Sequence, residues 1–146
     1  MNPELQGKQY PPATPYLVGR EKVREFARAM QATHAEHHDV EAARAAGHAD
    51  LVAPPTFPIV VQQRTWDQLL DDPDAGIELS RIVHGDQRFT ASRAIVAGDE
   101  LAAQLTVTRV RSLGGNDIVT CETVVTDAAG DHVVTATSSL VVGGDA

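Results

Sequence analysis

The sequence has 146 residues, of which 42% are hydrophobic and 22% charged, so it can bury one core but not two. We expect a single domain over residues 1–146, with an extended segment at 1–14. Twelve basic residues against twenty acidic ones give a formal net charge of −8, which argues against binding nucleic acid through its phosphates. The single cysteine, Cys121, excludes an internal disulfide and favours a reducing, cytoplasmic location.

Neither a membrane span nor a secretory signal is expected. The longest apolar passage, residues 53–61, is interrupted by three prolines and is too short to cross a bilayer. Residues 1–19 carry Pro11, Pro12 and Pro15 among polar residues and lack the continuous apolar run of a secretory signal.

The first half of the chain carries helical signals. Residues 16–18 suggest a short strand, and apolar residues at helical spacing predict a helix over residues 21–31. Asp39 is suited to cap a second short helix at 40–46, and Gly47 is a natural stop beyond it.

A longer, buried helix is predicted over residues 55–70. Proline costs no hydrogen bond in the first helical turn, and the segment supplies apolar faces at helical spacing. The sequence Asp71-Asp72-Pro73 marks its end.

After Gly76 the pattern changes to strands rich in Val, Ile and Thr, with short turn-forming connections that include Gly85-Asp86. The predicted strands cover residues 77–84, 87–93, 100–112, 118–127 and 132–142. The last three should form an antiparallel meander because their connections are short. We therefore predict an α+β fold in which an antiparallel sheet wraps around one central helix.

Four segments of this chain resemble the N-terminal MaoC-like dehydratase family: YLVGREKVREFARA at 16–29, DVEAARAAGH at 39–48, VAPPTFP at 52–58 and VHGDQRF at 83–89. The resemblance covers nearly the whole chain and implies a hot-dog fold whose domains pair side by side. The chain is similar to the non-catalytic subunit of actinobacterial (R)-3-hydroxyacyl-ACP dehydratases.

The resemblance also implies a catalytic site that is incomplete here. The broader family uses an Asp and a His five residues apart to activate water. Aligned on the segment at 39–48, the His falls on His37, but the Asp falls on Ala32. His37 is thus either a surviving general base, helped by His34 or Glu36, or a solvated or helix-capping loop residue.

Pro55, Thr56 and Phe57 are candidate substrate-binding residues. In the family, backbone N–H groups at the start of the central helix face the thioester carbonyl, where negative charge develops. The resemblance places Thr56 and Phe57 there, with Phe57 also lining an acyl tunnel. Alternatively, the same residues simply start a buried helix.

Other polar features have structural explanations. His34, His37 and His38 lack the order and carboxylates of a zinc site, so we expect no metal and no cofactor. The sequence His84-Gly85-Asp86 is expected to form a turn at a strand end. Cys121 lies among strand formers and is expected to be a buried, inert thiol.

The favoured hypothesis is an acyl-thioester-binding subunit of an (R)-specific 3-hydroxyacyl dehydratase or enoyl hydratase. Its substrate would be an acyl-CoA or acyl-ACP, and a MaoC-like catalytic partner would supply the Asp and His. The alternatives are a self-sufficient homodimeric hydratase or thioesterase, and a non-enzymatic acyl-binding protein.

Overall fold

The structure is a computed structural model and describes residues 1–144. Within this range the elements are β1 (Tyr16–Leu17), α1 (Arg20–Ala29), α2 (Val40–Ala45), α3 (Pro58–Leu70), β2 (Ile82–Ala91), β3 (Glu100–Leu113), β4 (Asn116–Thr126) and β5 (His132–Val142). Single 3-10 turns lie at Pro3–Leu5, Ala35–His37 and Leu79–Arg81. None of the helices in the described chain is long and apolar enough to span a membrane.

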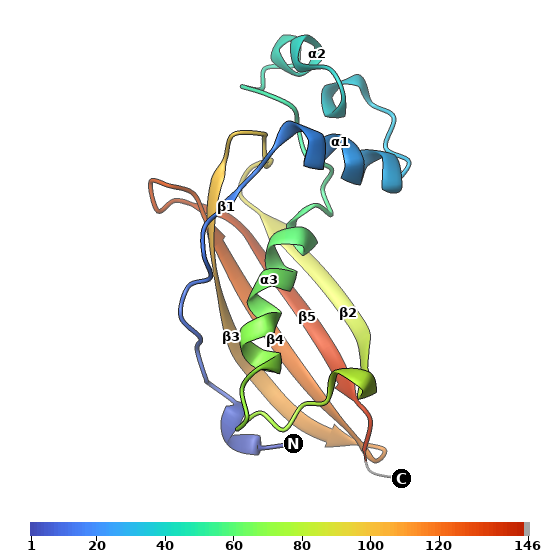
Figure 1. Cartoon of the computed structure of the whole chain (residues 1–146), viewed down its shortest axis with the longest axis vertical. Helices are drawn as coiled ribbons and strands as arrows, with labels where there is room; N and C mark the ends of the chain where they lie inside the picture. Colours follow the sequence, from blue (N-terminus) through green and yellow to red (C-terminus); the bar gives the residue numbers. More distant parts are fainter. Residues whose placement is uncertain (145–146) are drawn as a thin grey trace.

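The strands form one antiparallel sheet in the order β1-β3-β4-β5-β2. The sheet curls around α3, while α1 and α2 lie beyond one of its ends (Figure 1). The predicted α+β hot-dog fold and the meander of β3, β4 and β5 are confirmed. The edge strand β2 pairs with β5, its partner far along the chain.

The core is divided by a polar layer. One apolar cluster includes Phe57, just before α3, and Val61 within it, and a second includes Leu69. Between them, Gln62 and Thr65 are fully buried against the sheet. The side chain of Thr65 donates to the Gln62 carbonyl at 2.7 Å and lies 3.2 Å from the hydroxyl of Thr123 on β4. Hydrogen bonding offsets the cost of burying these groups.

Helix α3 begins at Pro58, three residues later than predicted. A helix beginning at residue 55 would require Pro58 to donate the first helical hydrogen bond, and proline has no N–H. At the first helical position this missing donor costs nothing. Residues 54–57 instead form a turn in which the Phe57 N–H donates to the Pro54 carbonyl at 2.9 Å.

The prediction of two strands joined by a turn at Gly85-Asp86 is wrong. Residues 82–91 form the single strand β2, whose register against β5 shifts between His84 and Asp86. A Cβ at Gly85 would lie 3.2 Å from Cγ2 of Val141 and 3.4 Å from the Ser139 carbonyl oxygen. Glycine therefore permits the close approach of β5 at a bulge rather than a chain reversal.

The N-terminal segment, predicted to be extended over residues 1–14, contains one helical turn and then runs along β3. The N–H groups of Tyr10 and Ala13 donate to the carbonyls of Leu105 and Ala103 at 2.9 and 2.8 Å. The Tyr10 hydroxyl donates to the carboxylate of Asp72, just after α3, at 2.6 Å, and Lys8 pairs with the same carboxylate. These contacts fasten the segment to the end of the central helix.

Acid should release this attachment. Hydrogen bonds from Lys8 and then Tyr10 lower the pKa of Asp72 to about 2. Because the folded pKa lies below the unfolded value of about 3.9, the carboxylate contributes stability above pH 4 and loses it as the pH falls toward 2. We predict that Asp72→Asn lowers the free energy of unfolding at pH 7 and flattens its decline between about pH 4 and pH 2, measured by urea unfolding. Asp71→Asn, an exposed neighbouring carboxylate, should leave the wild-type pH profile unchanged.

Candidate functional site

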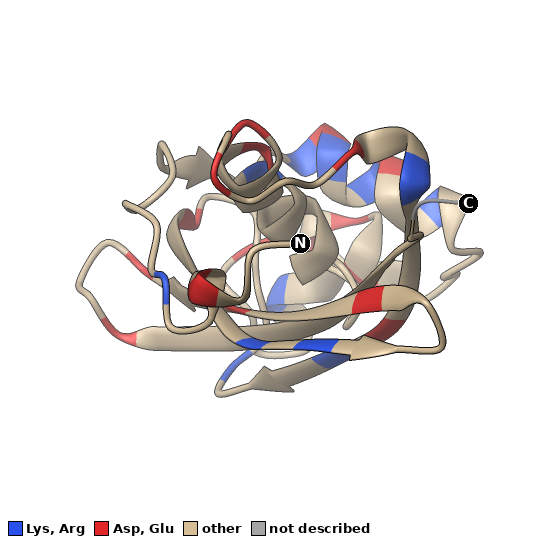
Figure 2. Ribbon diagram, turned by 90° about the horizontal axis from the view of Figure 1, so that it is seen from below, with Lys and Arg blue, Asp and Glu red and all other residues tan. Residues whose placement is uncertain are grey.

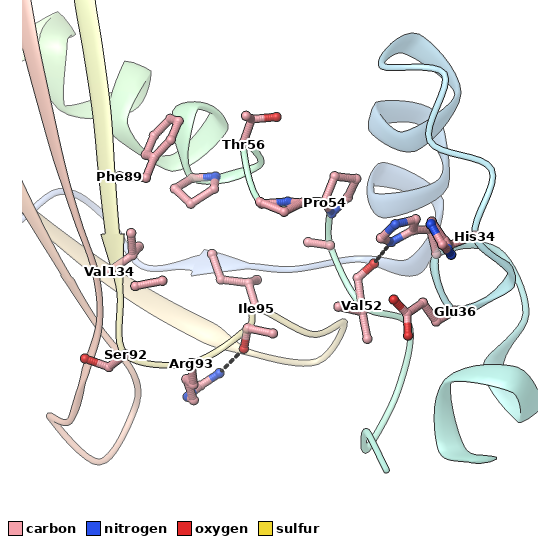
Figure 3. A pocket seen from close by; sticks show the side chains of 16 residues that line it. His34, Glu36, Val52, Pro54, Thr56, Phe89, Ser92, Arg93, Ile95 and Val134 are labelled. Atoms are coloured by element: carbon pink, nitrogen blue, oxygen red, sulfur yellow. Dashed lines mark hydrogen bonds between the residues drawn. The ribbon is translucent and has the colours of Figure 1, made fainter. Parts of the chain in front are cut away.

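A pocket of about 680 Å³ opens between the segment that carries α1 and α2 and the adjacent end of the sheet. Figure 3 shows Thr56 and Phe89 on one side of it, Ser92 and Arg93 on another, and His34 and Glu36 opposite. The wall is drawn from four parts of the chain, within residues 34–37, 52–58 and 89–95 and at residue 134. It is largely apolar, and its apolar residues are Val52, Ala53, Pro54, Pro55, Pro58, Phe89, Ala91, Ala94, Ile95 and Val134. This volume and lining suit a small ligand with an apolar portion.

His37 lies in this pocket and is held in one orientation. Its side chain is buried, with 6% of the residue exposed, so it is not the solvated loop residue of the alternative interpretation. The cap of α2 is Asp39, which excludes the capping alternative. The ring Nδ1 lies 2.6 Å from the Val52 carbonyl, which only accepts, so Nδ1 carries the proton. In the neutral ring, Nε2 then keeps its lone pair, and within residues 1–144 no group bonds to it.

At Ala32, where the family resemblance places the acid, only backbone atoms take part in hydrogen bonds. It follows Gln31, which ends α1 in the left-handed conformation with a φ of 56°. The Ala32 N–H donates to the Ala27 carbonyl at 2.8 Å, and its carbonyl accepts from Nε2 of His38 at 2.8 Å. Glu36 carries the only carboxylate in the pocket wall, and it lies 4.0 Å from Nε2 of His48.

The turn before α3 leaves one free N–H at the pocket. Pro54, Pro55 and Pro58 have no N–H, and that of Phe57 is bonded to Pro54. Thr56 alone in this turn has an N–H without a partner among the described residues. Pro55 and Thr56 line the pocket.

Phe57 is placed differently from the other two candidates. Its side chain is fully buried and does not form part of the pocket wall. The ring meets Phe26 edge to face at 5.4 Å between centroids and Tyr16 at 6.4 Å. Phe57 therefore holds the turn from inside the core.

Several pocket residues were not anticipated from the sequence. Phe89 and Val134 reach the pocket because β2 pairs with β5, and a pairing this distant in sequence leaves no local signal. Arg93 lies at the rim, held by Asp99 at 2.8 Å and Asp127 at 3.3 Å. His84, which the sequence placed in a turn, packs edge to face on Trp66 at 5.4 Å, outside the pocket wall.

The histidine cluster does not form a metal centre. The ring centroids of His34 and His38 lie 6.2 and 6.3 Å from that of His37. In the part of the chain that the structure describes, no three His, Cys, Asp or Glu side chains are arranged to hold a metal ion. The buried Cys121 thiol has its pKa raised to about 12 by desolvation, so it is not a reactive nucleophile at neutral pH.

The curled antiparallel sheet, the helix that it encloses and the pocket at the start of that helix define a hot-dog protein of the MaoC-like dehydratase class. Residues 4–136 match the model of the FAS1-like dehydratase domain region, and the chain belongs to this family. A UPF0336 protein of Leifsonia xyli subsp. xyli is 66% identical over 145 residues, covering 99% of this chain and 97% of the relative. A UPF0336 protein of Streptomyces coelicolor is 45% identical over 141 residues, covering 97% and 94%.

Solved structures agree with this assignment. A chain of the C-terminally truncated HadBC (3R-hydroxyacyl-ACP dehydratase) complex from Mycobacterium tuberculosis is 33% identical, with a TM-score of 0.86. The match covers 97% of this chain and 99% of that chain. A MaoC-like dehydratase is 34% identical with a TM-score of 0.88, covering 99% of this chain but only 44% of its own.

Phe57 is expected to contribute mainly to the stability of the fold. Replacing it with alanine leaves a cavity beside Phe26 and Tyr16, so we predict that Phe57→Ala lowers the free energy of unfolding by about 3–5 kcal/mol in urea denaturation. The matched control is Leu17→Ala, since that side chain is 68% exposed, and its effect should stay within about 0.5 kcal/mol. A loss below about 1 kcal/mol for Phe57→Ala would contradict the core assignment.

Proposed function

We propose that the chain is the acyl-thioester-binding subunit of an (R)-specific 3-hydroxyacyl dehydratase or enoyl hydratase and relies on a MaoC-like catalytic partner. The main support for this proposal is that a hydrogen-bond donor, a histidine and an apolar wall occur together in one pocket. A free Thr56 N–H and an oriented His37 accompany an apolar wall, while Ala32 stands where the family has its acid. The pocket is suited to binding a thioester but lacks the carboxylate of the Asp–His pair.

The reaction explains why both kinds of group are needed. In dehydration, a base removes a proton from C2, the hydroxyl leaves C3 as water with a proton from an acid, and the C2–C3 double bond forms. Negative charge develops on the thioester oxygen during this step, where an N–H donor stabilises it. Thr56 supplies that donor, and the partner's Asp and His supply the proton transfers.

Pairing is supported by the fold and by the comparisons. Hot-dog domains pair side by side, so a second subunit can bring its own Asp and His to a shared active site. The HadBC neighbour, similar to this chain over nearly its whole length, comes from a dehydratase complex. The proposed assembly is a heterodimer with a MaoC-like subunit, and a homodimer is the alternative.

The carrier of the acyl group is CoA or an acyl carrier protein. Acidic carrier proteins favour basic docking surfaces, and α1 holds four cations. Three of them are paired with carboxylates: Arg20 with Asp50, Lys22 with Glu25 and Arg24 with Glu21. Figure 2 shows the resulting mixture of basic and acidic residues. Helix α1 is thus mixed in charge rather than a strongly basic surface, which weakens the case for carrier-protein docking there.

A cytoplasmic location, supported by the unpaired thiol of Cys121, belongs to the same proposal.

A self-sufficient homodimeric hydratase is the second candidate. Glu36 and His37 line the same pocket, and Nε2 of His37 is free to act as a base. Glu36 would then replace the acid missing at position 32. This candidate requires turnover by the chain without any partner.

The Thr56 amide provides a direct test of thioester binding. We predict that saturating butyryl-CoA moves the Thr56 amide proton downfield in ¹H–¹⁵N spectra, because the carbonyl oxygen accepts a hydrogen bond from it. S-butyl-CoA, a thioether that lacks only this oxygen, should occupy the pocket without causing that shift. Equal shifts with both compounds, or none with either, would contradict the assigned role of Thr56.

A further inference from the structure

The polar layer in the core begins one turn of α3 away from the pocket residue Pro58. Gln62 is fully buried, and its side-chain amide donates to the Ala136 carbonyl at 3.1 Å and to the Ser138 hydroxyl at 3.3 Å. Its side-chain oxygen accepts a hydrogen bond from Gln87 of the edge strand β2 at 2.8 Å. These bonds link α3 to both β5 and β2.

The same elements line the pocket and carry the polar layer. Pro58 of α3 contributes to the wall, and Gln62 lies one helical turn further along the same face. Phe89 of β2 also contributes to the wall, and Gln87 lies two residues further on the same face of the strand. The register pairs Phe89 with Ala136 and Gln87 with Ser138, so both steps lead in the same direction.

An alkyl chain that entered from the pocket would therefore meet the Gln62–Gln87 hydrogen bond. Methylene groups cannot replace either partner of that bond. Passage would leave buried amide groups unsatisfied, which costs more than a neutral hydrogen bond contributes when formed. Beyond the bond lies the second apolar cluster, with Trp66 packed against it.

We propose that the Gln62–Gln87 hydrogen bond closes the acyl channel and limits the substrate to acyl chains of about six carbons. This inference rests on the proposed function and specifies its substrate class. Pro58, the pocket residue at the start of α3, precedes Gln62 by four residues, about 6 Å along the helix. An extended alkyl chain built from C–C bonds of about 1.5 Å advances roughly 1.3 Å per carbon, so about five carbon–carbon steps beyond the carbonyl fill this distance.

The test measures the affinity of the full chain for saturated acyl-CoAs of four to twelve carbons by titration calorimetry. In wild type, affinity should rise by about fourfold per methylene and stop rising near six carbons. In Gln62→Leu/Gln87→Leu, which replaces both partners with apolar side chains, the rise should continue to longer chains. The exposed neighbour gives the matched control, Gln63→Leu, which should keep the wild-type limit.

Trp66 offers a second readout, because it is the only tryptophan in the sequence and lies one turn beyond Gln62. Decanoyl-CoA should change its emission in the double variant and not in wild type. If the double variant does not fold, Gln87→Ala breaks the same bond while Gln62 keeps its contacts with β5, and it should extend the limit likewise.

The outcomes separate the two proposals. Wild-type affinity that keeps rising through ten carbons would overturn the proposed chain-length limit while leaving thioester binding intact. An unchanged chain-length limit in the folded variants would do the same. Failure of every acyl-CoA to bind would overturn the proposed function and the chain-length limit together.

Discussion

Helix α3 lies on the concave face of the curled sheet, and the pocket and the polar layer take their positions from this contact. Pro58 fixes where the helix begins, so the preceding turn brings Thr56 to the end of the sheet. One turn further, Gln62 forms hydrogen bonds with β5 and with the edge strand β2. A shift of α3 along its axis would move Thr56 and Gln62 together. In the proposals made above, the packing that stabilises the core therefore also sets how long an acyl chain the site accepts.

The pocket contains an oriented histidine, but alanine stands at position 32, where the family resemblance places the acid. His37 is buried and fixed by the Val52 carbonyl, and this fixed tautomer suits a proton acceptor. Ala32 is occupied entirely in ending α1 and anchoring His38 through its backbone. Pro54, Pro55 and Pro58 have no N–H and that of Phe57 is bonded to Pro54, so Thr56 has the one N–H in this stretch without a partner among the described residues. In the proposed function, this chain binds and orients the thioester, and a partner subunit supplies the missing acid.

Local patterns predicted the local structure, and long-range contacts accounted for what they missed. The Asp39 cap, the meander of the last three strands and the proline start of the central helix follow from short-range rules, although the start of α3 was placed three residues early. Gly85 was mistaken for a turn residue because nothing near it in sequence indicates that β5 approaches closely there. His37 is held by the Val52 carbonyl, from a segment 15 residues further along the chain. Phe89 lines the pocket beside Val134 because β2 pairs with β5. Such contacts depend on how the elements assemble, which a single sequence does not specify.

We infer that this chain binds the acyl thioester and needs a second subunit for chemistry. Its most direct test is the hydration of trans-2-hexenoyl-CoA, followed by loss of enoyl absorbance, as this chain is titrated into a MaoC-like subunit that carries the Asp–His pair. We expect no turnover by this chain alone and a rate that rises with added chain until the two subunits are equimolar. Turnover by this chain alone, abolished by His37→Gln or Glu36→Gln and unaffected by the partner, would contradict it.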